Sequence, residues 1–132
     1  MKKIRVRPTI LAIDDSPVAL RAVSAVLGGE YEVLTLTEPE ELERIMKKIK
    51  PDLFLLDCKM PGTGGFELIP VIRGLEGHLN TRIIFLTSEG TIENLTAAIA
   101  LGACDFIVKP FIPDVLRERI AKHIARRRFL FS

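Results

Sequence analysis

Short apolar runs alternate along the chain with segments in which apolar residues recur at helical spacing. The run at 9–13 is continuously apolar, which is typical of a strand buried on both faces. After it, Ser16 is suited to cap a helix, Pro17 suits the first helical position, and Gly28-Gly29 predicts the end of that helix. The expected strands are 9–13, 31–36, 52–57, 82–87 and 105–109, and the expected helices are 17–27, 38–49, 66–72, 91–101 and 113–127.

The second expected helix carries the most explicit start signal. Thr37 and Glu40 have the spacing of a capping box, acidic residues follow in the first turn, and lysines occupy the last turn, as the helix dipole favours. We therefore predict a helix whose buried stripe runs from Leu42 to Ile49.

Five strand–helix units in succession predict an α/β fold in which a parallel sheet is covered by helices on both faces. In open sheets of this kind, ligands bind beyond the carboxyl ends of the strands. The chain has 132 residues, which is enough for one domain and too few for two. We assign 9–127 to this domain, 1–8 to a basic N-terminal arm, and 128–132 to a tail or the start of a linker.

The composition is that of a globular domain, with 48% hydrophobic and 27% charged residues. No apolar run approaches the roughly 18 residues that a membrane span requires, and no apolar segment follows the basic start, so neither a span nor a secretory signal is expected. Cys58 and Cys104 form neither a disulfide framework nor a CxxC motif. We expect reduced thiols that act as small buried hydrophobes, and a cytoplasmic location.

The net charge is only +2, but basic residues gather at both ends of the chain, at 2–7 and 126–128. They are either solvated termini or a contact for nucleic acid or an acidic partner. No aromatic residues interleave with them, and no helix-turn-helix follows the five units, so we expect no direct nucleic-acid binding. The apolar residues 129–131 predict either continuation into a linker within a longer protein or docking on a partner.

Polar side chains follow four of the five expected strands. Because the carboxyl ends of parallel strands meet at one edge of a sheet, we expect these side chains to lie together. Each alone is explained as a helix cap or turn former, but caps require neither a threonine ending the fourth strand nor a lysine after the fifth. The residues are Asp14 and Asp15 after the first strand, Asp57 after the third, Thr87 ending the fourth and Lys109 after the fifth.

Such a cluster has a defined chemistry. Crowded carboxylates repel one another, and a hard divalent cation such as Mg²⁺ relieves the repulsion while keeping several water ligands. The cation would also offset the charge of an incoming phosphoryl group, so that a carboxylate can act as nucleophile. Lys109 would pair with the phosphoryl oxygens, and the Thr87 hydroxyl and the backbone N–H of Ser88 would donate hydrogen bonds.

The pattern resembles the receiver domains of response regulators in two-component signalling. The resemblance rests on the acidic pair, on Asp57 followed by Met-Pro-Gly at 60–62, on the threonine ending the fourth strand, and on Lys-Pro-Phe at 109–111. It covers about residues 9–125. It implies a three-layer flavodoxin-like fold, similar to that of chemotaxis regulators, with five parallel strands in the order 2-1-3-4-5.

The resemblance also implies a role for each residue. Asp57 would accept the phosphoryl group from a histidine kinase or phosphotransfer protein. Asp14, Asp15, Asp57 and the backbone carbonyl of Lys59 would hold Mg²⁺ or Mn²⁺. Thr87, Lys109 and the backbone N–H of Ser88 would contact the phosphoryl group. Phe106 would be an aromatic that rotates inward on activation, although its place between two strand residues, taken alone, favours ordinary core packing. The Lys109–Pro110 peptide bond would be cis.

The output surface is expected around the helix 91–101, which has one charge in eleven residues. Its exposed face is either an interaction surface or is covered by neighbouring segments. The resemblance implies that this helix, with 105–109 and 113–127, is remodelled by a shift between pre-existing states and controls a downstream protein or an attached output domain. A homodimer is compatible with the same surface.

Two other classes of protein fit the sequence less well. A receiver that signals without phosphorylation would not need the complete set of site residues. A metal-dependent phosphatase or phosphotransferase with an aspartyl intermediate often has a second Asp two residues after the nucleophile, and Lys59 stands there instead. The Lys59 side chain would reach the phosphoryl site or point to water. We therefore expect a switch and not an enzyme, and we expect His78 and His123 on the surface, neither as a phosphodonor.

Overall fold

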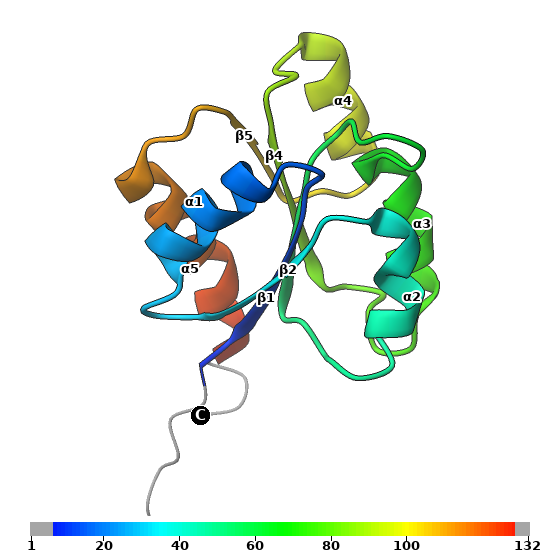
Figure 1. Ribbon diagram of the computed structural model, residues 1–132, viewed down its shortest axis with the longest axis horizontal. Helices are drawn as coiled ribbons and strands as arrows, with labels where there is room; N and C mark the ends of the chain where they lie inside the picture. Colours follow the sequence, from blue (N-terminus) through cyan, green and yellow to red (C-terminus); the bar gives the residue numbers. More distant parts are fainter. Residues whose placement is uncertain (1–6, 129–132) are drawn as a thin grey trace, which may run out of the picture.

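The computed structural model describes residues 7–128, with side chains described up to residue 124. Five parallel strands form one sheet in the order β2-β1-β3-β4-β5, and helices cover both faces (Figure 1). The predicted flavodoxin-like fold and strand order are therefore confirmed. The strands are β1 (Thr9–Ile13), β2 (Glu32–Leu36), β3 (Leu53–Leu56), β4 (Arg82–Thr87) and β5 (Asp105–Val108); the helices are α1 (Pro17–Leu27), the 3₁₀ turn η1 (Pro39–Glu41), α2 (Leu42–Ile45), α3 (Gly65–Gly74), α4 (Ile92–Ala100) and α5 (Pro113–Arg128).

The helices pack on the sheet in two layers. α1 and α5 cover one face, and α2, α3 and α4 cover the other (Figure 1). Because the strands are buried on both sides, β3 carries four consecutive buried residues. The first core contains Leu20, Val23 and Leu27 of α1 and Leu116, Ile120 and Ile124 of α5, as their spacing predicts; the second contains Leu42, Leu68, Ile69, Ile72 and Ala98.

The start of α1 follows from its sequence. The side chain of Ser16 accepts a hydrogen bond from the Ala19 N–H at 3.2 Å, and Pro17 occupies the first helical position. This is the predicted cap, and it fixes the direction in which the chain leaves the preceding acidic pair.

The second helix differs from its prediction. Glu38, not Thr37, precedes the first helical turn, and its side chain makes no capping bond. The segment is a 3₁₀ turn followed by only four α-helical residues, so the capping box and the long helix were wrong. Within η1 and α2, only Pro39 and Leu42 are fully buried. So little burial provides little packing energy to extend the helix.

The two histidines are not on the surface, contrary to expectation. His78 is buried, with its ring edge-on to Phe54 and its Nδ1 2.8 Å from the Thr81 Oγ1. His123 is mostly buried against β5, with its Nε2 3.2 Å from a carboxylate oxygen of Asp105. In both cases a polar side chain lies within hydrogen-bonding distance of a ring nitrogen, which is why burial is tolerated.

α4 is the least embedded of the major helices. Its buried side chain is Ala98, while Ile92, Leu95 and Ile99 are exposed. The exposed apolar face that the sequence predicted is therefore present. Within the described residues, no helix is both long and apolar enough to cross a membrane.

Candidate functional site

The strand register brings the predicted polar residues to one edge of the sheet. Ile13 is opposite Leu56 in the parallel pairing, and the backbone N–H of Asp57 donates to the carbonyl of Ile13 at 3.2 Å. On the other side of β4, the Lys109 N–H donates to the carbonyl of Thr87 at 2.8 Å. The main chain thus aligns the carboxyl ends of the central strands, so the side chains that follow them share one site.

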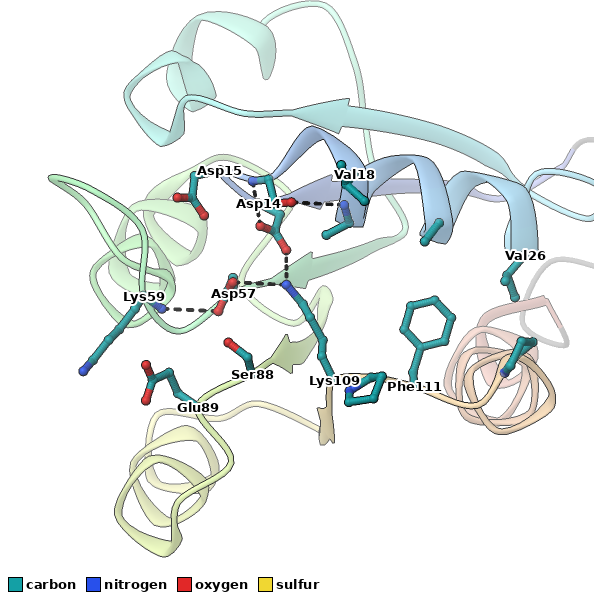
Figure 2. Close-up of a pocket in the computed structure, with 15 residues that line it drawn as sticks. Asp14, Asp15, Val18, Val26, Asp57, Lys59, Ser88, Glu89, Lys109 and Phe111 are labelled. Carbon is teal, nitrogen blue, oxygen red and sulfur yellow. Dashed lines mark hydrogen bonds and ion pairs between the residues drawn. The ribbon is translucent and has the colours of Figure 1, made fainter.

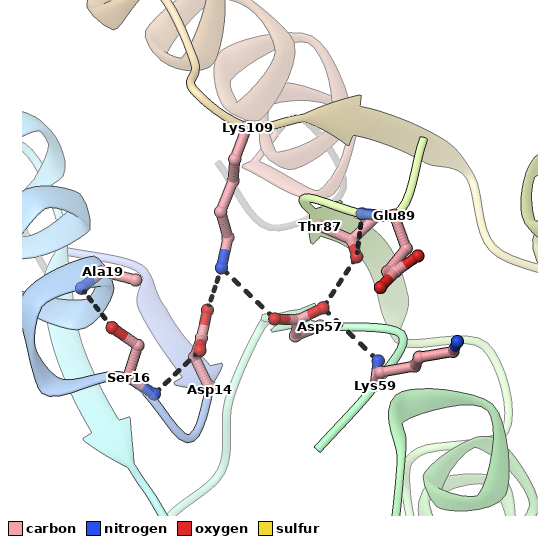
Figure 3. Close-up of polar contacts among 8 residues, drawn as sticks. All are labelled: Asp14, Ser16, Ala19, Asp57, Lys59, Thr87, Glu89 and Lys109. Atoms are coloured by element: carbon pink, nitrogen blue, oxygen red, sulfur yellow. Dashed lines mark hydrogen bonds and ion pairs between the residues drawn. The ribbon is translucent and has the colours of Figure 1, made fainter. Parts of the chain in front are cut away.

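Asp57 lies at the centre of this site and is buried. One carboxylate oxygen, Oδ1, accepts a hydrogen bond from the Thr87 hydroxyl at 2.7 Å, and the other, Oδ2, lies 3.3 Å from the Lys109 ammonium (Figure 3). The Lys59 N–H is 3.4 Å from Oδ1. Both oxygens are therefore oriented by neighbours at the carboxyl ends of β3, β4 and β5.

Lys109 bridges two of the carboxylates. Its ammonium donates to Asp14 as well as to Asp57 (Figure 3). Burial lowers the pKa of Lys109, but the hydrogen bonds and charges of Asp14 and Asp57 outweigh that effect, and the net result is a raised pKa. Lys109 is therefore a fixed positive charge at neutral pH.

The three carboxylates fit a divalent cation. Asp14, Asp15 and Asp57 each offer an oxygen, and these atoms lie within 4.8 Å of one another. Asp14 and Asp57 are buried, whereas Asp15 is exposed and has no ion-pair partner in the described part of the chain. One ammonium faces three carboxylates, so the site holds excess negative charge, and the oxygen ligands are those that Mg²⁺ prefers.

The close approach of α3 also shapes the site. A Cβ atom placed on Gly65 would lie 2.2 Å from the backbone oxygen of Asp57 and 2.7 Å from the Phe85 ring. Only glycine fits there, and the Gly65 N–H donates to the carbonyl of Cys58 at 3.1 Å. The sequence showed a Gly-rich turn but not this contact.

The structure also gives the positions of Ser88, Lys59 and Phe106, while their roles stay predictions. Ser88 is exposed beside Asp57, and the Lys59 side chain is exposed and extends away from the carboxylates (Figure 2). Phe106 is partly buried and packs on Phe85, with ring centroids 6.3 Å apart. The peptide bond Lys109–Pro110 is cis, as predicted.

Sequence reasoning missed the apolar half of the site. A cleft of about 780 Å³ extends from the carboxylates along α1 to Phe111 (Figure 2). Its floor includes Val18, Ala22 and Val26, which recur every four residues on α1. This spacing forms a second apolar stripe beside the core stripe, and it was visible in the sequence.

Glu89 is a second residue that sequence reasoning missed. It also lines the cleft, and its N–H donates to the Thr87 oxygen at 3.1 Å (Figure 3). The Thr87 hydroxyl therefore donates to Asp57 and accepts from the Glu89 N–H.

One buried thiol, that of Cys58, lies beside the site. Burial raises the pKa of the Cys58 thiol to about 11, against an opposing hydrogen bond from Thr87. Cys58 is fully enclosed in the second core, so it acts as the small buried hydrophobe that the sequence predicted, and Cys104 is partly buried on the other face.

A parallel sheet of this order, with an acidic cluster, a threonine and a lysine at its carboxyl edge, defines a signalling domain of the two-component class. The family model of the response regulator receiver domain matches residues 10–121. The chain belongs to this family, and receiver domains are signalling switches.

Individual relatives agree with the family match. The chain is 36% identical over 120 residues to the phosphate regulon transcriptional regulatory protein PhoB of Pseudomonas aeruginosa, covering 90% of this chain and 52% of that protein. The chemotaxis protein CheY4 of Vibrio cholerae has 31% identity and a TM-score of 0.83, covering 89% of this chain and 99% of that chain. The chain spans about half the length of this PhoB and a smaller share of several other curated relatives, down to 17%.

One similar structure was solved with a metal ion. It is the receiver domain of a Pseudomonas aeruginosa sensor histidine kinase, with a magnesium ion coordinated in its active site cleft. Its TM-score is 0.81 at 25% identity, covering 91% of this chain and 99% of that chain.

Proposed function

We propose that Asp57 accepts a phosphoryl group in a Mg²⁺-dependent reaction and that this modification switches the domain between two states. The observation that carries the proposal is the placement of Asp57 within hydrogen-bonding reach of Thr87 and Lys109 and beside two further carboxylates. A structural role for these groups alone would not favour three carboxylates against one ammonium.

The chain's own residues account for the transfer. A carboxylate oxygen of Asp57 forms the new bond to phosphorus, while the bond from phosphorus to the donor breaks and its electron pair leaves with the donor. Lys109, the Thr87 hydroxyl and the backbone N–H of Ser88 receive the phosphoryl oxygens. Asp14, Asp15, Asp57 and the backbone carbonyl of Lys59 would hold Mg²⁺ or Mn²⁺, which supplies charge neutralisation at the phosphoryl group.

The state of Asp57 is proposed to reach partners through the surface formed by α4, β5 and α5. Thr87 connects the acceptor to the loop before α4, and the exposed apolar residues Ile92, Leu95 and Ile99 lie on that helix. Phe106, packed on Phe85, is the aromatic proposed to change position with the state of the site. The partner that binds this surface would be a downstream protein, an attached output domain or a second copy of the chain.

The proposal includes the phosphodonor, the cellular location and the extent of the chemistry. The donor is a histidine kinase or a phosphotransfer protein, the location is cytoplasmic, and the only chemistry is acceptance and slow loss of the phosphoryl group. The chain covers 52% of the length of the Pseudomonas aeruginosa PhoB, which is consistent with an attached output domain. The predicted docking of residues 129–131 concerns residues outside those that the structure describes.

Acetyl phosphate tests the reaction directly. The purified protein is incubated with acetyl phosphate and MgCl₂, and its intact mass is followed beside Asp57→Ala and Asp52→Asn. Asp52 is a matched control because it precedes the same strand at its opposite end, where its carboxylate accepts the Thr9 N–H at 2.8 Å. We expect a gain of one phosphoryl group in the wild type and Asp52→Asn, and none in Asp57→Ala or in EDTA.

Two outcomes would contradict the proposal. An equal gain in Asp57→Ala would place the acceptor elsewhere. No gain in the wild type with acetyl phosphate or a histidine kinase, under conditions in which Mg²⁺ binding is measured separately, would favour a module that signals without phosphorylation.

A further inference from the structure

A second cavity lies at the opposite end of the sheet from the acidic site. It has a volume of about 490 Å³ and is formed by the end of α3, the start of β4 and the loop between α4 and β5. β4 separates the two sites: Arg82 begins this strand and Thr87 ends it, about 16 Å apart at the usual strand rise. The polar residues that line the cavity include Arg73, Asn80, Thr81, Arg82 and Cys104.

Arg73 is held in a fixed position in this cavity. One nitrogen of its guanidinium, Nη1, donates to the carbonyl oxygens of His78 at 3.0 Å and of Thr81 at 2.7 Å. These acceptors are neutral, so they orient the guanidinium without cancelling its charge. Burial lowers the pKa of Arg73, but a guanidinium remains charged at neutral pH.

Arg82 supplies a second positive charge without a carboxylate partner. Across the described residues it makes no hydrogen bond or ion pair with an acidic side chain, although it is only partly exposed. Burial raises the pKa of the Cys104 thiol, the charge of Arg82 lowers it, and the charge of Asp105 raises it; Cys104 in turn acts on the pKa of Arg73. Asp105 is paired with Arg119 and His123 and does not line the cavity. Both guanidinium groups therefore lie near Cys104, and no acidic residue is found among those described as lining the cavity.

We propose that this cavity binds an anion that carries a phosphate group. Two partly buried positive charges without counter-charges are costly, and a bound anion would compensate both. Guanidinium groups match the oxygens of phosphate in pairs, and a dianion serves two of them better than the single charge of a carboxylate does. The volume suits a small ligand. This binding is independent of phosphorylation at Asp57, since it uses none of the residues of that site.

An NMR titration tests the proposal. Sodium phosphate is added to ¹⁵N-labelled protein at pH 7.5 in EDTA and at constant ionic strength, and amide shifts are followed. We expect saturable shifts at 79–83 and 102–104, and at least about tenfold weaker binding of acetate. Arg82→Gln is expected to weaken phosphate binding by about tenfold or more, since a charged hydrogen-bonding partner is lost. Arg44→Gln, which changes an exposed arginine on α2, is expected to leave it unchanged.

The spectra themselves show whether each variant is folded. Arg82→Lys, which keeps the charge but not the paired donors, is expected to bind with intermediate affinity. The proposal is overturned by shifts that do not saturate, by shifts confined to 14–15, 57 and 87–89, by equal binding of acetate, or by an Arg82→Gln affinity equal to that of the wild type.

Discussion

Replacing Gly65 with alanine is the sharpest test of how α3 supports the phosphoacceptor. The added methyl group would lie 2.2 Å from the Asp57 carbonyl oxygen, more than 1 Å closer than the 3.4 Å at which ordinary contact begins. The second neighbour, the Phe85 ring at 2.7 Å, is fully buried and cannot turn away. Either α3 or the chain at Asp57 must therefore move.

The energetic cost can be bracketed. Overpacking of this kind costs about 1–3 kcal/mol, and a contact with backbone belongs at the upper end of that range. Alanine restricts the unfolded chain more than glycine, which returns about 0.4–1 kcal/mol. The net expected loss in the free energy of unfolding is about 2 kcal/mol, or roughly 8 °C in Tm for a domain of this size.

Urea denaturation and thermal unfolding measure this loss, and the rate of acetyl phosphate labelling reports the displacement of Asp57. Gly74→Ala is the matched control, because Gly74 ends the same helix, has no left-handed backbone angle, and has nothing within 4 Å of an added Cβ. It is expected to be neutral or slightly stabilising. If Gly65→Ala is as stable as Gly74→Ala, the close approach of α3 to Asp57 is refuted.

Three further predictions concern the cap of α1, the buried thiol and the central ammonium. Ser16→Ala removes the acceptor of the Ala19 N–H, and we expect urea denaturation to show a loss of about 1 kcal/mol. The pKa of Cys58 rises from 9.0 to about 11 in the folded protein, so the unfolded chain loses this proton first. The folded state therefore favours the protonated thiol. This preference contributes about 2–3 kcal/mol to the free energy of unfolding at high pH as a loss: stability is unaffected below pH 9 and falls by that amount between pH 9 and 11. Lys109→Met leaves two buried carboxylates unpaired, so we expect a loss of about 3 kcal/mol in EDTA and a smaller loss in Mg²⁺.

Each of these predictions has its own control. Ser24→Ala, in the interior of α1, is expected to cost nothing, so an equal loss there would contradict the capping argument. Cys58→Ala is expected to flatten the dependence of stability on pH above 9, and an unchanged slope would assign it to other groups. An equal loss for Lys109→Met in EDTA and in Mg²⁺ would count against a cation at the three carboxylates.

The sequence was informative wherever a rule about parallel sheets applied. Alternation of apolar runs with helical segments predicted all five strands, and β4 has the bounds that were expected. Because strand ends converge at one edge of a parallel sheet, the sequence predicts that Asp14, Asp57, Thr87 and Lys109 lie together, and in the structure they do. Their roles in phosphoryl transfer stay predictions.

The failures have one physical origin. The capping box at Thr37 was a local signal that lacked tertiary support, since the segment buries little apolar surface. His78 was expected on the surface, but its contacts with Thr81 and Phe54 are set by how the chain before β4 folds back. The contact of Gly65 with Asp57 likewise depends on helix placement. Such packing between distant segments is not encoded in periodicity.

The weak anchoring of α4 has a consequence for how the domain can move. Detaching α4 exposes one fully buried side chain, that of Ala98, whereas detaching α3 would expose Leu68, Ile69 and Ile72. The free energy of local opening is therefore far smaller for α4 than for α3, and its amide hydrogens are expected to exchange without global unfolding. α4 can thus be repositioned while both cores stay packed, and it begins five residues after Thr87.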